Sequence, residues 1–380
     1  MKVIVAPDKF KGSCPADRVA AAIAQGWKSI FPQDETVLVP LADGGEGMLD
    51  AMCAACGGEI RTAAVRGPLG SSVDAKWLLL ADGGAVVEMA QASGLVLVKE
   101  QDRNVRKADT FGTGELIRAA LDAGCRRLIV GIGGSATNDG GMGMLRALGA
   151  SFLGAAGEII EPGNLDKLIR VDFSGFDTRV AQCSFTVACD VANPLIGPEG
   201  ASVVFGPQKG ASPEDVTHMD SCLRRLSDVV AAAMGCDRSK DPGAGAAGGL
   251  GWSLTQCCGA RMRPGIDIVL DAAGFEEALD GAGLVITGEG SLDGQSAMGK
   301  TPVGVAARAR KRGVPVAAIA GTLGRGHEAV YDMGIDCAAG IAPGPMPLED
   351  AMGRAEELIW QASARLARAI RLGQAMGVRL

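Results

Sequence analysis

The chain repeatedly places a short apolar segment directly before a glycine-rich polar loop, and helical spacing follows several of these loops. Residues 2–6 lead into the loop 7–13, and apolar side chains then recur at 3.6-residue spacing through residue 30. The same apolar-then-glycine succession returns at 36–41, 127–132, 284–287 and 314–320. Because strands and helices alternate from the first residue, the pattern predicts an α/β fold with a parallel sheet and helices on its faces.

Composition agrees with that interpretation. The chain has 380 residues, which at roughly 150 residues per domain predicts two domains, with three as the alternative. Glycine accounts for 56 residues and aromatics for only 4%, a balance that disfavours a β-sandwich. The net charge of −7 disfavours nucleic acids and anionic membranes as partners.

The middle of the chain has a different pattern, typical of antiparallel strands. Residues 73–80 and 85–89 resemble an antiparallel pair across the turn at 82–84, which favours a second, mixed domain. The segment 349–372 predicts an amphipathic packing helix, and Ser13 is a plausible N-cap for the first helix.

Cellular location and metal chemistry are constrained by what the sequence lacks. The first apolar stretch is too short for a signal peptide, and the longest uncharged stretch, 242–260, lacks sustained apolarity, so we expect a soluble cytoplasmic protein. Cys53 and Cys56 fit small buried helix residues better than a redox or zinc pair. With His218 and His327 as the only histidines, a histidine metal centre and a Ser-His-Asp triad are disfavoured.

The loops combine glycine with lysine, hydroxyl and carboxylate side chains. Glycine lets the backbone present N–H groups to anions, lysine neutralises phosphate or carboxylate, and Asp or Glu binds Mg²⁺ or accepts a proton. That inventory, without histidine, suits phosphoryl transfer.

Two nucleotide motifs offer alternatives. Residues 131–136 match a dinucleotide fingerprint, but no strand ending in an acidic residue follows at the required spacing. Residues 294–301 match GxxxxGK[ST], yet the preceding strand is expected to end near Thr287, and Pro302 falls in the first helical turn. An NAD-dependent oxidoreductase and a P-loop kinase of another hydroxy acid therefore stay as alternatives.

Taken together, these loops resemble bacterial glycerate kinase type 1, the family that phosphorylates glycerate with ATP. The matching segments keep the family order over nearly the whole chain. One departure is Cys14-Pro15, where the family usually has a Leu-Ser-like pair. The segments are 6–13, 41–47, 131–141, 189–195, 205–211, 243–249 and 288–290, followed by Asp293, Gln295, Gly299 and Lys300.

The resemblance implies a flavodoxin-like (Rossmann-like) parallel-sheet domain of residues 1–67 plus 283–380 and an inserted mixed α/β domain of residues 68–282. It also implies an active site in the cleft between them, and conversion of D-glycerate and ATP to 2-phosphoglycerate with Mg²⁺. Glycerate and ATP are the expected partners, without nucleic acid or membrane, and a homodimer is kept as a hypothesis.

Candidate residues follow from this chemistry, because glycerate needs a cation for its carboxylate and a base near its reacting hydroxyl. Asp190, which ends an apolar strand, is the first choice as base, with Lys9 and Lys11 as further catalytic residues. The substrate-binding candidates are Asp8, Lys9, Ser13, Asp43, Asn193 and Lys209. The nucleotide- or phosphate-binding candidates are Gly44, Gly45, Gly133, Gly134, Ser135, Thr137, Asn138, Glu289 and Lys300, and the metal candidates are Asp43, Glu46, Asp139 and Asp293.

Several alternatives stay open at this level. Asn is a common turn residue, so a turn role competes with a binding role for Asn138 and Asn193. Phosphorylation of the 3-hydroxyl and non-catalytic binding of a sugar acid also remain. The hydroxyl that reacts depends on the placement of the base, which sequence does not determine.

Overall fold

The computed structural model describes residues 1–294, 296 and 299–377, and the chain divides into two compact units. The first unit contains Met1–Asp43, Asp50–Cys56 and Ile266–Leu380, and the second contains Gly44–Leu49 and Gly57–Gly265. No helix among the described residues is both long enough and apolar enough to cross a bilayer.

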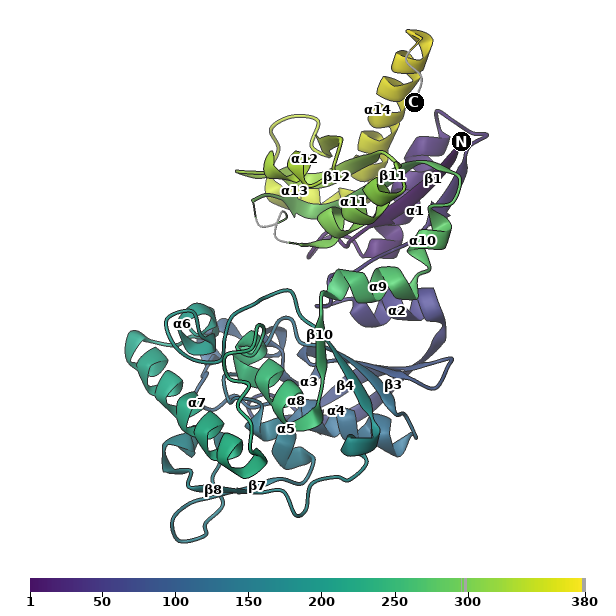
Figure 1. Ribbon diagram of the computed structural model, residues 1–380. Coiled ribbons are helices and arrows are strands. Elements are labelled where there is room, and N and C mark those ends of the chain that lie inside the picture. The colour runs from purple at the N-terminus through teal and green to yellow at the C-terminus, as the bar shows by residue number, and fades with distance from the viewer. Residues whose placement is uncertain (295, 297–298, 378–380) are drawn as a thin grey trace. The chain divides into compact units, whose positions relative to one another are not determined.

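The first unit is built on a five-stranded parallel sheet in the order β13-β12-β11-β1-β2. Figure 1 labels three of its strands, β1, β11 and β12. In the sequence order of this unit's own strands this is 5-4-3-1-2, the flavodoxin-like order. The order reverses between β1 (Lys2–Pro7) and β11 (Ala282–Leu292), which makes the carboxyl ends of these two strands a topological switch point.

Helices cover both faces of this sheet. Strand residues such as Val5 and Ile286 share an apolar cluster with Trp27 of α1 (Ala16–Lys28) and Leu358 of α14 (Ala355–Ala375). A further helix, α11 (Thr301–Lys311), contacts β11, β12 and β1 and contributes no described residue to that cluster. The remaining elements of this unit are β2 (Glu35–Leu38), α2 (Met48–Cys56, shared with the second unit), α9 (Gly265–Ala272), α10 (Phe275–Ala278), β12 (Val316–Leu323), α12 (Ala329–Asp332), β13 (Cys337–Gly340) and α13 (Leu348–Gly353).

The second unit contains a six-stranded mixed sheet in the order β10-β9-β6-β5-β4-β3. The four strands from β10 to β5 are parallel, and β4 and β3 complete the sheet as antiparallel strands. The strands are β3 (Gly58–Arg66), β4 (Ser72–Leu80), β5 (Ala85–Glu88), β6 (Arg127–Gly131), β9 (Ser184–Ala188) and β10 (Arg261–Arg263), and β7 (Ser151–Leu153) pairs separately with β8 (Arg170–Asp172).

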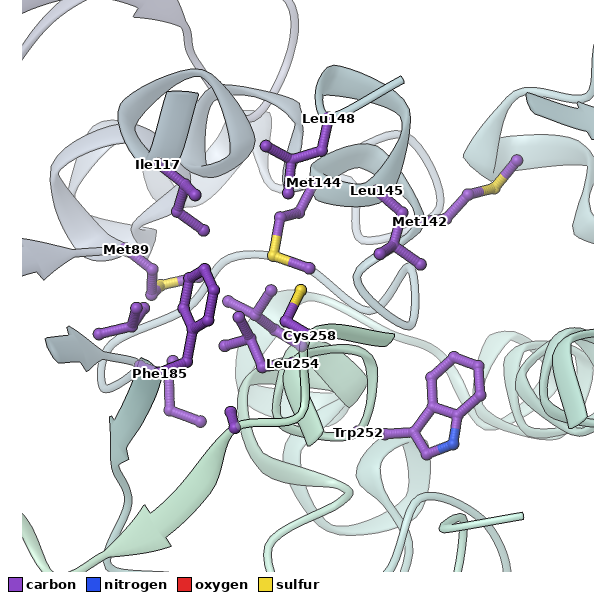
Figure 2. Close-up of a cluster of buried hydrophobic side chains, with 14 of the residues drawn as sticks. Met89, Ile117, Met142, Met144, Leu145, Leu148, Phe185, Trp252, Leu254 and Cys258 are labelled. Atoms are coloured by element: carbon purple, nitrogen blue, oxygen red, sulfur yellow. The ribbon is translucent and has the colours of Figure 1, made fainter. Parts of the chain in front are cut away.

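A large apolar cluster stabilises this unit. Figure 2 shows side chains from several elements converging in it, among them Met144, Phe185, Leu254 and Cys258. The helices are α3 (Ala90–Ser93), α4 (Phe111–Asp122), α5 (Met142–Ala147), α6 (Ala201–Phe205), α7 (Pro213–Met234) and α8 (Leu250–Cys258), and the 3₁₀ turns are η1 (Leu95–Leu97), η2 (Glu100–Asp102), η3 (Pro162–Lys167), η4 (Val180–Gln182), η5 (Pro207–Lys209) and η6 (Ala246–Gly249).

The unit boundaries have local physical causes. Both chain ends belong to the first unit, and the predicted division into 1–67 plus 283–380 and 68–282 stays a prediction. However, β3 lies in the second unit because it pairs with β4 along its whole length. In turn, α9 and α10 lie in the first unit, where Arg308 of α11 forms ion pairs with Asp267 and Glu276.

Three local predictions were wrong. Ser13 does not cap α1: its hydroxyl donates to Phe10 O at 3.0 Å within a closed loop, and Pro15 occupies the N-cap. The strand expected at 284–287 continues to Leu292, because β12 pairs with it throughout. The helix expected at 349–372 is two helices, α13 and α14, separated at Arg354 with φ of −110°.

Candidate active site

Two buried carboxylates lie at the switch point of the first unit. Asp8 follows β1, and its backbone N–H donates to Gly288 O at 2.8 Å, so Asp8 lies beside Glu289 of β11. Asp8 is 6% exposed and Glu289 is 9% exposed. Ligands of open α/β sheets bind at such strand ends, so this pair is a strong candidate for chemistry.

The electrostatics of the pair are unusual for carboxylates. Burial raises the pKa of Asp8 to about 6, opposed by Lys9 and reinforced by Asp43. Burial likewise raises the pKa of Glu289 to about 7, while a hydrogen bond from Ser296 opposes the shift. Carboxylates with a pKa near neutrality are suited to accepting and releasing protons.

The two carboxylates differ in their hydrogen bonds. Asp8 is held on both oxygens, because Oδ1 accepts from Lys9 N at 2.7 Å and Oδ2 accepts from Thr301 Oγ1 at 2.7 Å. In contrast, Glu289 Oε1 is buried and has no hydrogen-bond partner among the described residues. The orphaned oxygen of Glu289 is therefore the one that a substrate proton or a bound group could satisfy.

Cationic side chains accompany this pair. The Nζ atom of Lys9 lies 3.8 Å from Asp8 Oδ1, and Lys11 is exposed in the same loop. Lys300 is the N-cap residue of α11, and its charge lowers the pKa of Glu289. These lysines carry the positive charge that phosphate and carboxylate groups require.

The GxxxxGK[ST] motif also falls in this unit, and one argument against a P-loop was wrong. The preceding strand ends at Leu292 rather than near Thr287, so it comes close to Gly294. Gln295, Ala297 and Met298 of the motif lie outside the described residues. The Thr301 hydroxyl, however, is already used as a donor to Asp8.

The second unit presents the glycine-rich loop 133–141 after β6. A Cβ atom on Gly133 would lie 2.9 Å from Gly45 Cα, and one on Gly44 would lie 2.8 Å from Ala188 Cβ. The predicted glycines thus allow the loop after β6 and the end of β9 to approach the segment 44–49 closely. Glu46 of that segment, predicted to bind metal, is exposed.

Lys209, predicted to bind substrate, is 2% exposed. Its ammonium donates to Ser135 Oγ at 2.7 Å and to Thr137 O at 2.6 Å. Burial lowers the pKa of Lys209 to about 7, and the charge of Asp139 opposes that shift. Lys209 therefore holds the loop directly.

Asp139 has a structural environment. Its Oδ2 atom accepts from Thr110 N, Thr110 Oγ1 and Gly143 N, and its Oδ1 atom accepts from Gly141 N. Asn138 Nδ2 donates to Ser202 Oγ at 2.9 Å. The metal-binding role expected for Asp139 stays a prediction, and these four hydrogen bonds argue against it.

Asp190 and Asn193 follow β9. Asp190 is exposed, and its Oδ1 accepts from Gly265 N at 3.0 Å. Asn193 Nδ2 donates to Glu199 O at 2.8 Å, and Asn193 O accepts from Gly245 N. These bonds account for Asn193 as a turn residue, so its binding role and the base role of Asp190 stay predictions.

Sequence reasoning missed two residues. Glu88 ends β5, is 2% exposed, and accepts from Leu49 N at 2.7 Å, which ties the segment 44–49 to the sheet. Thr301 holds Asp8. The acidic residue directly after the apolar run 85–87 was an available signal for Glu88, but nothing in the local sequence pairs Thr301 with Asp8.

Mg²⁺ fits this chemistry only with help from a ligand. No group of three or more His, Cys, Asp or Glu side chains within the described residues is arranged to hold a metal ion. Mg²⁺ in kinases is commonly bound by one or two carboxylates plus substrate phosphates. The acidic first unit, where Asp43 raises the pKa of both Asp8 and Glu289, suits that kind of binding.

The dinucleotide alternative is disfavoured by the fold. The next strand after the loop 133–141 is β7, which pairs only with β8 in a separate two-stranded sheet. A dinucleotide-binding unit requires the next strand to extend the same parallel sheet.

Known proteins resemble this chain over almost its whole length. The model of the Glycerate kinase family matches residues 3–371. A glycerate kinase of Bacillus subtilis (strain 168) is 49% identical over 379 residues, covering 99% of each chain. A glycerate 2-kinase of Escherichia coli (strain K12) is 46% identical and covers 98% of this chain and 99% of its own. A crystal structure of an assigned glycerate kinase 2 from Salmonella typhimurium LT2 superposes with a TM-score of 0.88 at 45% identity, covering 99% of both chains.

Proposed function

The chain belongs to the glycerate kinase family and is an enzyme of that class; from this premise we propose that it transfers the γ-phosphoryl group of ATP to the 2-hydroxyl of D-glycerate. The products are ADP and 2-phosphoglycerate. The choice of the 2-hydroxyl is supported by the 46% identity to a glycerate 2-kinase over nearly the whole chain.

The observation that carries the chemical part of the proposal is the carboxylate pair at the β1–β11 switch point. Glu289 accepts the proton of the reacting hydroxyl, because its Oε1 atom is buried without a partner among the described residues and its pKa is about 7. Asp8 is fixed by Lys9 N and Thr301 Oγ1 and stays in place as the neighbouring charge.

Phosphoryl transfer depends mainly on positioning and on neutralising phosphate charge. In this proposal Lys9, Lys11 and Lys300 neutralise charges of the substrates, and the loop 133–141 of the second unit presents backbone N–H groups to anionic oxygens. Asp43 and Asp293 would hold Mg²⁺, which would supply charge neutralisation at the phosphates.

Asp190 is the competing base. It lies at the carboxyl end of a parallel strand, a usual place for ligand-binding groups. It is exposed, whereas Glu289 is buried in the surroundings that raise a carboxylate pKa toward neutrality. We therefore assign the base role to Glu289, and the variants compared in the Discussion distinguish the two.

The test is ADP release from Mg-ATP and D-glycerate, with product detected by enolase in the absence of phosphoglycerate mutase. We expect ADP together with an immediate enolase signal. A signal that requires added mutase would move the phosphate to the 3-hydroxyl. If no ADP forms with D-glycerate, the proposed activity is wrong.

We further propose that the enzyme works in the cytoplasm, where ATP is available, and that its partners are its two substrates. A homodimer stays a prediction. Light scattering of the purified chain at several concentrations tests it, and a constant mass near 38.6 kDa would contradict it.

A further inference from the structure

Two polar groups in one short loop of the second unit lack a protein partner among the described residues, and a third has a single partner. Thr137 Oγ1 and Asn138 Oδ1 are buried without a hydrogen-bond partner among the described residues. Ser135 is 7% exposed, and within the described residues its hydroxyl oxygen has one hydrogen bond, from Lys209 Nζ. Buried polar groups are rarely left unpaired, so this loop is built to meet something else.

The chemistry of lysine determines which way the Ser135 hydroxyl points. In its protonated form Lys209 has three donors and no acceptor, so Ser135 Oγ accepts the 2.7 Å bond from the Lys209 ammonium. The hydroxyl hydrogen of Ser135 is therefore directed to a different acceptor. No acceptor for it is recorded among residues 1–294, 296 and 299–377, which leaves a buried donor available to a ligand.

The backbone around this donor is held on both sides. Gly134 O accepts from Leu95 N at 2.8 Å, and Ala136 N donates to Ser93 O at 2.9 Å. Lys209 Nζ adds the bond to Thr137 O at 2.6 Å. A donor fixed in this way loses little entropy when it binds an anion, which is the property of a preorganised anion site.

The loop and its surroundings contain one buried cation, Lys209, and one buried anion, Asp139. Asp139 contributes the nearby negative charge, but four backbone and hydroxyl donors already satisfy its oxygens. Burying the Lys209 ammonium is costly, and burial accordingly lowers its pKa to about 7. A hydrogen bond from a cation also polarises the accepting hydroxyl, which makes that hydroxyl a stronger donor.

We infer that Lys209 is a positioning residue that acts through Ser135, whose hydroxyl donates to an anionic oxygen of a substrate. That oxygen belongs either to the carboxylate of glycerate or to a phosphate of the nucleotide. This inference rests on the proposed function, and it differs from the expectation that Lys209 itself binds substrate.

The test is a double-mutant cycle on kcat/KM with Mg-ATP and D-glycerate, using S135A, K209M and the double variant. A lost hydrogen bond to a charged group predicts a drop of about 10- to 100-fold for S135A, with a similar drop for K209M. Because Lys209 acts through Ser135, the double variant should stay within about threefold of K209M. S135T keeps the hydroxyl and should recover most of the activity.

Each outcome decides the inference. Drops that multiply in the double variant would mean that Lys209 contacts substrate independently, and wild-type activity in S135A would also overturn the inference. S135A and S135T decide the matter if K209M does not fold. S221A and K240M, at exposed positions in the same unit, are the matched controls.

The KM values distinguish glycerate from ATP as the ligand of Ser135, and wild-type activity distinguishes failure of the proposed function from failure of this inference. A raised KM for glycerate in S135A assigns the oxygen to the carboxylate, and a raised KM for ATP assigns it to the phosphate. The wild type is measured first. Absence of wild-type ADP formation overturns the proposed function, whereas equal ADP formation by wild type and S135A overturns only this inference.

Discussion

At the residue scale, Glu289 combines two properties that normally oppose each other. A buried carboxylate with one unpartnered oxygen destabilises a folded protein, yet the same burial brings the pKa of Glu289 to about 7, near the value that suits a proton acceptor. Such a conflict between stability and function is typical of active sites. Asp8, in contrast, is paired on both oxygens and stabilises the geometry around it.

E289Q should therefore be less active and more stable. Loss of the base predicts a kcat about 10²- to 10⁴-fold lower. The folded-state pKa is raised above the ordinary 4.5, so the cost of ionising Glu289 is absent below pH 4.5, grows as the pH rises, and is complete above about pH 7. The variant should gain about 1–3 kcal/mol in free energy of unfolding at pH 8 and almost nothing near pH 4.5.

Urea unfolding at the two pH values and steady-state kinetics measure both effects. E277Q, at an exposed position in the same unit, is the matched control and should change neither quantity. D190N tests the competing base. A larger loss of kcat in D190N than in E289Q would return the role to Asp190.

At the scale of elements, the loop 133–141 depends on the glycine-rich turn η6 and not on its own sequence alone. Gly248 has φ of 67°, and a Cβ atom there would lie 2.0 Å from Thr137 O and 2.6 Å from Asn138 Cα. Thr137 O is also an acceptor for Lys209. A side chain at Gly248 would thus displace the segment that Lys209 holds.

G248A should lower both stability and kcat/KM, whereas G259A should lower stability only. Gly259 has nearly the same φ, 66°, but a Cβ atom there meets nothing within 4 Å. The conformational cost of about 1–2 kcal/mol is therefore common to both variants, and the clash is specific to G248A. Urea unfolding and kcat/KM with D-glycerate compare them, and equal kcat/KM values would show that η6 does not position the loop.

At the scale of the whole molecule, each unit has a core of its own. The first unit's cluster includes Ile286 and Leu358, and the second unit's cluster includes Leu254 and Phe185. Local stability follows local burial, so the two sets of strands need not lose protection together.

A core truncation should therefore act mainly within its own unit. L254A removes a fully buried side chain and should cost about 2–5 kcal/mol. Native-state hydrogen exchange should show faster exchange in β6 and β9 with little change in β1 and β11, and I286A should show the reverse. Equal acceleration in both units for either variant would mean that the chain unfolds as one cooperative unit.

The local sequence determined the alternation of strands and helices, the antiparallel turn at 82–84 and the glycine-rich loops, because these depend on side-chain periodicity and backbone conformation within a few residues. The family followed from the order of several such loops. The local sequence did not determine that β11 ends at Leu292, because its last residues are strand only through pairing with β12. The sequence also predicted Ser13 as the N-cap of α1, whereas the Ser13 hydroxyl donates to Phe10 O within the preceding loop.

Only the tertiary structure decided which polar groups are satisfied and which are not. The bond between Asp8 and Thr301 joins residues 293 positions apart, and Lys209 reaches Ser135 across 74 positions. Burial, and with it the pKa of Glu289 and the unpaired hydrogen of Ser135, arises from such long-range contacts. Residue types and spacing can propose candidates for chemistry, but desolvation depends on everything that surrounds a group after folding.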